Sequence, residues 1–271
     1  MLEKHFNFGL DLSGSYTFGH SKSVNDGTSS VAYSNWQYNY SKDSNSKGEL
    51  GYSRFDIPHR ISLQASYTTP KYLNGWMSTT VGITYNASPG GRYSLSYDDA
   101  KDFNGDGSRG TTLLYIPTDK ELEDMNFVDN FDKQGNLIMS KEESREAFRQ
   151  WILNDDYAKN HRGQFAERNS NLTKWEHEIN LHVAQDIFYL KERGSKIQVT
   201  FDVINFANML NKKWGANYYL PYNLTPVTVS GSTNADGILV PEYTFKDQSN
   251  VLTKNDISSR WHCQVGVRLT F

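Results

Sequence analysis

The sequence has one cysteine, no marked excess of either charge and no long apolar run. A single cysteine, Cys263, cannot form a disulfide within the chain, and its place in an alternating apolar row is typical of a small hydrophobic residue. The 28 basic and 31 acidic side chains give a net charge of −3, which provides no argument for a nucleic-acid partner. No run of about 18 apolar residues occurs, which excludes a transmembrane helix.

These absences do not exclude a membrane protein. The mean hydropathy is −0.68, as in a soluble chain, but transmembrane β-strands alternate apolar and polar residues, and this alternation averages away. Aromatic residues make up 14% of the chain, a high share that barrels use at the two membrane interfaces.

The last eleven residues, WHCQVGVRLTF, alternate without a break. Trp261, Cys263, Val265, Val267, Leu269 and Phe271 are apolar, and the residues between them are polar or small. A strand places these two sets on opposite faces. The same pattern recurs in five other segments, residues 5–18, 60–68, 77–86, 175–187 and 197–204.

The links between these six segments are alternately short and long. Residues 70–76 and 189–196 form short links, whereas about 20–56, 88–173 and 209–256 are long. We therefore expect an all-β fold, an antiparallel transmembrane β-barrel segment of about six long strands with short periplasmic turns and long extracellular loops containing a little helix. The alternative is a soluble β-sandwich or barrel with one solvated face, for which the strands are long.

In a barrel, the apolar row faces lipid and the polar row faces the lumen. Charged side chains on the lipid face would be costly, so they are predicted to line the lumen. The predicted lumen-lining residues are Glu176, Glu178, His182, Asp186, Asp202, Arg260, Gln264 and Arg268. The expected location is the outer membrane of a Gram-negative cell.

Five segments carry a resemblance to a known family. SKSVNDGTSSVAYSNW, RFDIPHRISLQASY, DFNGDGSRGTTLLYIP, HRGQFAERNSNLTKWEHEINLHVAQD and VTFDVINFANMLNKKWG resemble, in this order, the last part of TonB-dependent outer-membrane receptors. The resemblance is greatest to the Oar-like and SusC-like receptors of Bacteroidetes. It implies a barrel of about 22 strands with an internal plug, and TonB-energised import of a bulky nutrient such as an oligosaccharide, peptide or chelate.

The sequence contains no plug or TonB box, so residues 1–271 are expected to form one domain, the C-terminal part of such a barrel. The implied partners are outer-membrane lipid, the rest of the barrel and its plug, TonB through that plug, and the barrel-assembly machinery. The resemblance implies an assembly signal in the final strand, at Trp261, Val265, Val267, Leu269 and Phe271. The alternative is a porin-like or surface-binding protein that does not depend on TonB.

Three features stand out in the long links. Asp102, Asn104 and Asp106 in DFNGDG have the spacing of calcium ligands, or else form an Asx/Gly turn. Trp36, Tyr38 and Tyr40 recur at every second residue and are either ligand-stacking aromatics or a strand extension. His161, Arg162, Glu167 and Arg168 are interpreted as a salt-bridged rim.

Local helix and hairpin signals also occur. Capping boxes at Thr118/Glu121 and Ser140/Glu143 predict two helices, and NFDKQGNLIM predicts a hairpin between them. No nucleophile, metalloprotease or phosphate-loop motif is present, so the protein is not expected to be an enzyme, and no cofactor beyond calcium is predicted.

Overall fold

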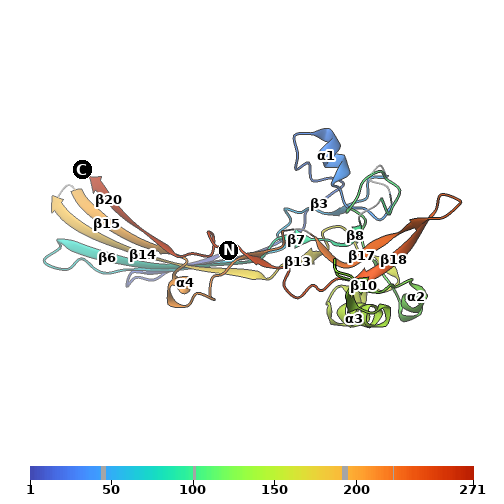
Figure 1. The fold of residues 1–271 in the computed structure, drawn as a ribbon. Helices are drawn as coiled ribbons and strands as arrows, with labels where there is room; N and C mark the ends of the chain where they lie inside the picture. The colour runs from blue at the N-terminus through green and yellow to red at the C-terminus, as the bar shows by residue number, and fades with distance from the viewer. Residues whose placement is uncertain (44–46, 100–101, 191–194, 222) are drawn as a thin grey trace.

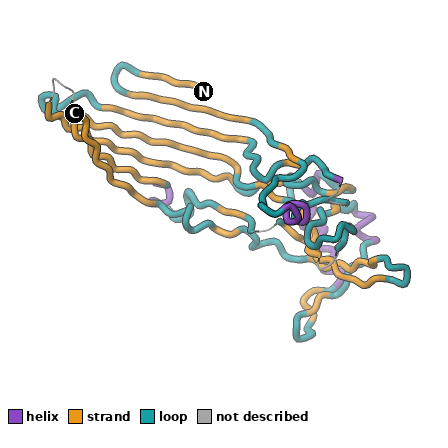
Figure 2. Tube along the Cα trace, turned by 90° about the horizontal axis from the view of Figure 1, so that it is seen from above, coloured by secondary structure: helices purple, strands orange, loops and turns teal. Residues whose placement is uncertain are grey.

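The computed structural model describes residues 1–43, 47–99, 102–190, 195–221 and 223–271. A long curved sheet forms one part of the molecule, and a compact layer of short strands and helices forms the other (Figures 1 and 2). We call the end of the sheet next to this layer the loop end and the opposite end the turn end.

The sheet has seven antiparallel strands in the order β1-β2-β5-β6-β14-β15-β20. They are β1 (Leu2–His5), β2 (Leu10–Phe18), β5 (His59–Thr68), β6 (Met77–Pro89), β14 (Trp175–Leu190), β15 (Ser195–Ile204) and β20 (His262–Thr270). Five of the six predicted strands are confirmed. In the described residues β1 and β20 are paired on one side only, so the sheet is open.

The predicted first strand, residues 5–18, is confirmed only from Leu10, where β2 begins, and is wrong before it. The chain reverses at Phe6–Gly9, where the Phe6 N–H donates to the Leu10 carbonyl at 2.8 Å and the Gly9 N–H donates to the Phe6 carbonyl at 3.0 Å. Gly9 has φ +97, and a Cβ there would lie 2.2 Å from the Thr68 carbonyl oxygen. The alternation continues through this turn, which explains why one strand was predicted where a hairpin forms.

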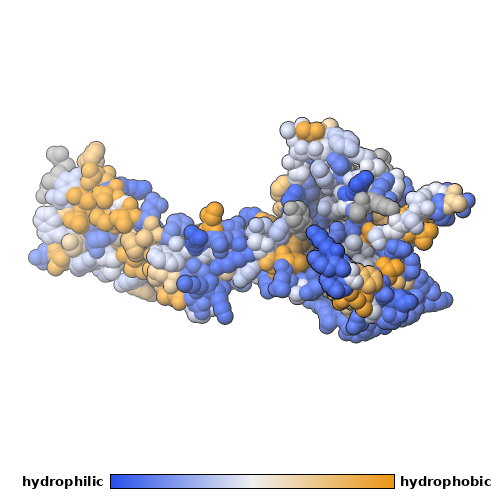
Figure 3. Space-filling model, in the orientation of Figure 1, coloured by the Kyte–Doolittle hydropathy of each residue, from blue (hydrophilic) through white to orange (hydrophobic). Residues whose placement is uncertain are grey.

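The pleat separates two faces of the sheet. The apolar face carries the large hydrophobic side chains, and these remain exposed: Ile83 is 48% exposed, Phe201 43% and Val267 68%. Apolar residues gather on the sheet around β15 and β20 (Figure 3). The opposite, polar face carries the charged residues of the same strands.

The hydrophobic core lies in the layer at the loop end, away from the long sheet. Here β8 (Leu95–Asp99) pairs in parallel with β17 (Leu224–Thr233), and β17 pairs with β18 (Leu239–Phe245). The helix α3 (Lys141–Asn154) packs on these strands, and its side chains Phe148 and Ile152 are fully buried. No described helix is both long and apolar enough to cross a membrane.

The remaining elements are short. They are β3 (Lys22–Ser23), α1 (Ala32–Gln37), β4 (Gly51–Tyr52), β7 (Arg92–Tyr93), β9 (Tyr115–Ile116), α2 (Asp119–Asp124), β10 (Asn130–Phe131), β11 (Leu137–Met139), η2 (Ala158–Asn160), β12 (Gln164–Phe165), β13 (Asn171–Leu172), α4 (Phe206–Leu210), β16 (Tyr218–Tyr219) and β19 (Thr253–Lys254). Of these, α4 packs against β14 of the long sheet (Figure 1). The β10–β11 hairpin confirms the prediction for residues 130–139, whereas the β17–β18 hairpin was not predicted.

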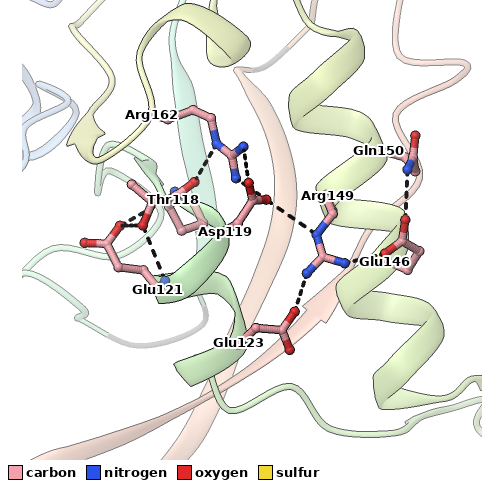
Figure 4. Close-up of polar contacts among 9 residues, drawn as sticks. Thr118, Asp119, Glu121, Glu123, Glu146, Arg149, Gln150 and Arg162 are labelled. Atoms are coloured by element: carbon pink, nitrogen blue, oxygen red, sulfur yellow. Dashed lines mark hydrogen bonds and ion pairs between the residues drawn. The ribbon is translucent and has the colours of Figure 1, made fainter.

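Both capping boxes are confirmed, at the start of α2 and of α3. An ion-pair network then joins the two helices (Figure 4). Arg149 pairs with Glu146 at 2.6 Å and with Glu123, while Arg162 donates two hydrogen bonds to Asp119, at 2.7 and 3.0 Å. The acidic partners are exposed, so the network orients the helices more than it stabilises them.

A buried ion pair joins the sheet to the layer. Arg92, just after β6, donates from Nε and Nη2 to Asp56, just before β5, both at 2.7 Å, and the two side chains are 3% and 2% exposed. The Ser21 N–H, after β2, also donates to Asp56, and Arg92 Nη1 donates to the Asn169 carbonyl, before β14, at 2.8 Å. One ion pair therefore connects the loop ends of four strands.

Burial alone would raise the pKa of Asp56, but the Ser21 N–H and the Arg92 guanidinium outweigh it, and the pKa lies below its ordinary value. A carboxyl whose folded pKa is lowered stabilises the fold above its unfolded pKa of about 3.9. This stabilisation is lost as the pH falls through the lower, folded pKa.

We predict that Asp56→Ala lowers the free energy of unfolding by about 3–5 kcal/mol, because it leaves the Arg92 charge buried and unpaired. Asp43→Ala, which removes an exposed carboxylate paired with Lys47, is the control and should cost no more than about 1 kcal/mol. Urea unfolding of the full chain in lipid vesicles measures both. Equal effects would show that the buried pair does not stabilise the junction.

Candidate functional site

A polar cavity of about 300 Å³ opens in the layer at the loop end. We call it the ligand cavity. Its wall includes Arg54, Arg92 and Arg168, together with Tyr38, Tyr40, Tyr93 and Asp26. These residues come from segments far apart in the chain, before β5, around β7, before β13 and after α1. Its size is at the lower end of the range of about 300–1,000 Å³ for small-molecule sites.

Two of the three aromatic residues singled out in the sequence line this cavity. Tyr38 and Tyr40 do so, whereas Trp36 lies outside it, next to Tyr33 at 5.7 Å between ring centroids. The strand extension predicted here is wrong, because residues 32–37 form α1. The Asn35 side chain holds this turn by accepting from the Ser29 N–H and donating to the Ser29 carbonyl, both at 2.7 Å.

The salt-bridged rim predicted around Arg168 is also wrong. Arg168 is 7% exposed and donates to the backbone carbonyls of Ser23 and Val24 and to the Asn39 side chain. Within the described chain it has no ion pair. Burial lowers its pKa from the ordinary arginine value, although the Asp26 charge opposes this. Its role is to fix the wall of the cavity.

The other members of the predicted rim also have different partners. Arg162 pairs with Asp119 instead of Glu167, and the His161 ring stacks on Tyr157 at 3.9 Å between centroids. Arg162 and Asp119 are 43 residues apart in the chain, so local spacing in the sequence does not reveal this pair.

Among the described residues of the cavity wall, Asp26 is the one carboxylate. Burial raises its pKa, but the Ser23 hydroxyl at 2.7 Å and the Arg54 N–H at 3.0 Å stabilise the charged form, and the net pKa is lowered. Asp26 is therefore ionised at neutral pH. Asp26, Arg54 and Arg92 were not singled out in the sequence, and Arg168 was interpreted only as part of a rim, because the tertiary fold alone brings these residues together.

The DFNGDG segment folds as a set of Asx turns. Asp102 accepts from the Asp106 and Gly107 N–H groups at 3.0 and 2.8 Å, and Asp106 accepts from the Ser108 N–H at 2.7 Å. Ser108 Oγ donates to the Gln37 carbonyl at 3.0 Å, so the turn packs against the end of α1. The described residues contain no cluster of three His, Cys, Asp or Glu side chains around a metal site, and calcium binding by Asp102, Asn104 and Asp106 stays a prediction.

Terbium luminescence tests this calcium prediction. The Trp36 ring lies about 4.0 Å from the position of a Cβ built on Gly107, close enough to sensitise a lanthanide held by the turn. A calcium loop predicts a Tb³⁺ signal that is competed by Ca²⁺ and lost in both Trp36→Phe and Asp102→Asn. Without such a signal, the segment is an Asx turn that supports α1.

The polar face of the sheet carries most of the predicted lumen residues, of which His182 and Asp202 contact each other. His182 Nδ1 lies 2.5 Å from Asp202, which is in register with Gln264 on β20. Lys196 and Gln198 donate to Asp186 at 2.6 and 2.8 Å. Glu178 accepts from Asn180 at 2.7 Å, and Arg268 is in register with Gln198. Glu176 is in register with Ser88 at the loop end, and Arg260 precedes β20.

The apolar face has the opposite chemistry. In the described strands β2, β5, β6, β14, β15 and β20 it carries no Asp, Glu, Lys or Arg. Near the loop end Trp175 stacks with His59 and His177, and Tyr16 and Tyr85 hydrogen-bond these histidines at 2.7 and 2.8 Å. Such a band of amphipathic rings beside an uncharged face is typical of a membrane interface.

Residues 1–228 match a known family, described as an outer membrane beta barrel domain. The chain belongs to this outer-membrane β-barrel family. No curated protein and no solved structure matches the chain. Membership accounts for the apolar face of the barrel domain, which contacts membrane lipid, and places the protein in the outer membrane.

The residues proposed as an assembly signal lie at the edge of the barrel domain. Val265, Val267 and Leu269 are on the apolar face of β20, and Trp261 and Phe271 flank that strand. All five are exposed. Their role in assembly stays a prediction.

The two faces predict different responses to a charge. Ile83→Arg places a guanidinium on the apolar face in the middle of β6 and should destabilise the inserted barrel domain by about 2–4 kcal/mol. Thr84→Arg, at the next position, places it on the polar face and should cost less than half as much. Folding equilibria in lipid vesicles measure both, and equal costs would contradict the assignment of the faces.

Proposed function

We propose that the chain is part of a TonB-dependent outer-membrane receptor that imports a bulky nutrient, with the loop end outside the cell. The ligand cavity is the observation that carries this proposal. Its wall includes Arg54, which precedes β5, and Arg92 and Tyr93, which follow β6, so a solute held there is near the loop ends of two strands of the sheet. The resemblance of five segments to TonB-dependent receptors supports the same function.

The open sheet supports a larger assembly. The outer edges of β1 and β20 present unpaired N–H and C=O groups within the described residues. Each such group costs several kcal/mol in hydrocarbon, so membrane-spanning sheets close into barrels. We infer that further strands pair with these edges, as the receptor proposal requires, and that a plug within the closed barrel connects it to TonB.

The alternative is a porin-like pore or a surface-binding protein. The charged polar face favours a hydrated lumen in both cases. The folded layer favours the receptor, because an open pore has no need of a loop region with its own core and cavity.

The energy dependence of solute uptake distinguishes the TonB-dependent receptor from the pore. Cells with and without the gene are incubated with oligogalacturonates, galacto-oligosaccharides and casein peptides, and depletion of each solute is followed by mass spectrometry. The proposal predicts gene-dependent depletion of at least one solute, lost when a protonophore collapses the proton gradient or when TonB is absent. Gene-dependent depletion that persists under both conditions would support the pore.

A further inference from the structure

Most polar side chains on the wall of the ligand cavity are already bound within the protein. The five asparagines are engaged by backbone groups or by Arg168, which removes them as free ligand contacts. They are Asn25, Asn35, Asn39, Asn169 and Asn223. An amide in such a network would have to give up a hydrogen bond within the protein in order to bind a solute. The asparagines therefore shape the cavity and are not its binding groups.

The charged groups are engaged as well, with one exception. Arg92 is paired with Asp56. Arg168 donates to the Ser23 and Val24 carbonyls and to the Asn39 side chain, its remaining Nε is buried without a partner, and it faces the opposite charge of Asp26. Arg54 differs, because its backbone N–H binds Asp26 while its exposed guanidinium has no ion pair or hydrogen bond within the described residues. Among the described residues of the wall, three arginines stand against Asp26 and the Asp56 partner of Arg92, which leaves one positive charge in excess.

This charge lies beside an aromatic wall. Arg54 and Tyr40 both line the ligand cavity. Burial raises the pKa of Tyr40, and the Arg54 charge partly opposes that rise. Tyr38 and Tyr93 line the same cavity. A guanidinium binds carboxylates with two parallel hydrogen bonds, and tyrosine rings offer a flat surface for a sugar ring or an apolar side chain.

We propose that the ligand cavity binds a carboxylate-bearing solute, with Arg54 as the group that binds the carboxylate and the tyrosines as the surface for the attached ring or side chain. This inference rests on the proposed function and narrows its substrate to anionic solutes. The carboxylate could belong to an acidic sugar or to an acidic peptide.

Calorimetry with the full chain in lipid nanodiscs tests the proposal with two matched pairs of probes. Trigalacturonate is compared with its methyl ester, and acetyl-Ala-Glu-Ala-amide with acetyl-Ala-Gln-Ala-amide. At least one carboxylate probe should bind about tenfold more tightly than its neutral partner, and more weakly as the salt concentration rises. Binding by the sugar or by the peptide identifies the source of the carboxylate.

Arg54→Gln should weaken binding of that probe about tenfold or more, because the bidentate contact is lost. Arg54→Lys keeps the positive charge but removes the planar guanidinium that donates two parallel hydrogen bonds, so it should give an intermediate loss of affinity. The control is Arg109→Gln, which changes an exposed arginine that does not line the ligand cavity and should leave affinity unchanged.

Three results would overturn the proposal: binding of neither carboxylate probe, equal binding of the neutral partners, or wild-type affinity in Arg54→Gln. Because the Arg54 side chain has no ion pair or hydrogen bond with the residues that the structure describes, the variant should fold as the wild type does, which is checked by heat-dependent gel mobility. If the carboxylate probe binds but no energy-dependent uptake is found, the carboxylate site is supported and the proposed import function is contradicted.

Discussion

Apolar and polar residues alternate along the long strands with a period of two, and the rest of the structure depends on this alternation. It places the acidic residues, lysines and arginines of these strands on one face and leaves them off the other, so the sheet can be stable only between lipid and water. The sheet therefore has no hydrophobic core of its own. The buried core forms in the layer at the loop end, around Phe148, Leu95 and Val227, where the links between strands are long enough to fold.

The junction between sheet and layer decides whether the ligand cavity exists. Asp56 and Arg92 connect the loop ends of β2, β5, β6 and β14, and Arg168 then fixes the chain beside Asn39. The Arg168 side chain passes close to Gly51, and this approach needs a glycine, since a Cβ at position 51 would lie 2.9 Å from the Arg168 Cβ. The cavity is thus built by buried arginines, while the exposed Arg54 remains available to a solute.

The sequence predicts what local patterns determine and misses what distant contacts determine. Five strands, both capping boxes and the β10–β11 hairpin follow from residues close together in the chain. The turn at Phe6–Gly9 was missed because alternation continues through it, and α1 because its aromatics repeat at a strand-like spacing. The parallel β8–β17 pair joins residues more than 120 apart, so the cavity next to it has no local signal beyond Tyr38 and Tyr40.

The central claim is that the sheet spans the outer membrane with the loop end outside. Labelling with a membrane-impermeant maleimide on intact cells tests it most directly. Asp236→Cys places a thiol at the exposed tip of the β17–β18 hairpin, while the native Cys263 lies on the apolar face as an internal control. The account predicts labelling at position 236 and none at Cys263. Labelling of Cys263 alone, or of neither thiol until the cells are broken, would contradict it.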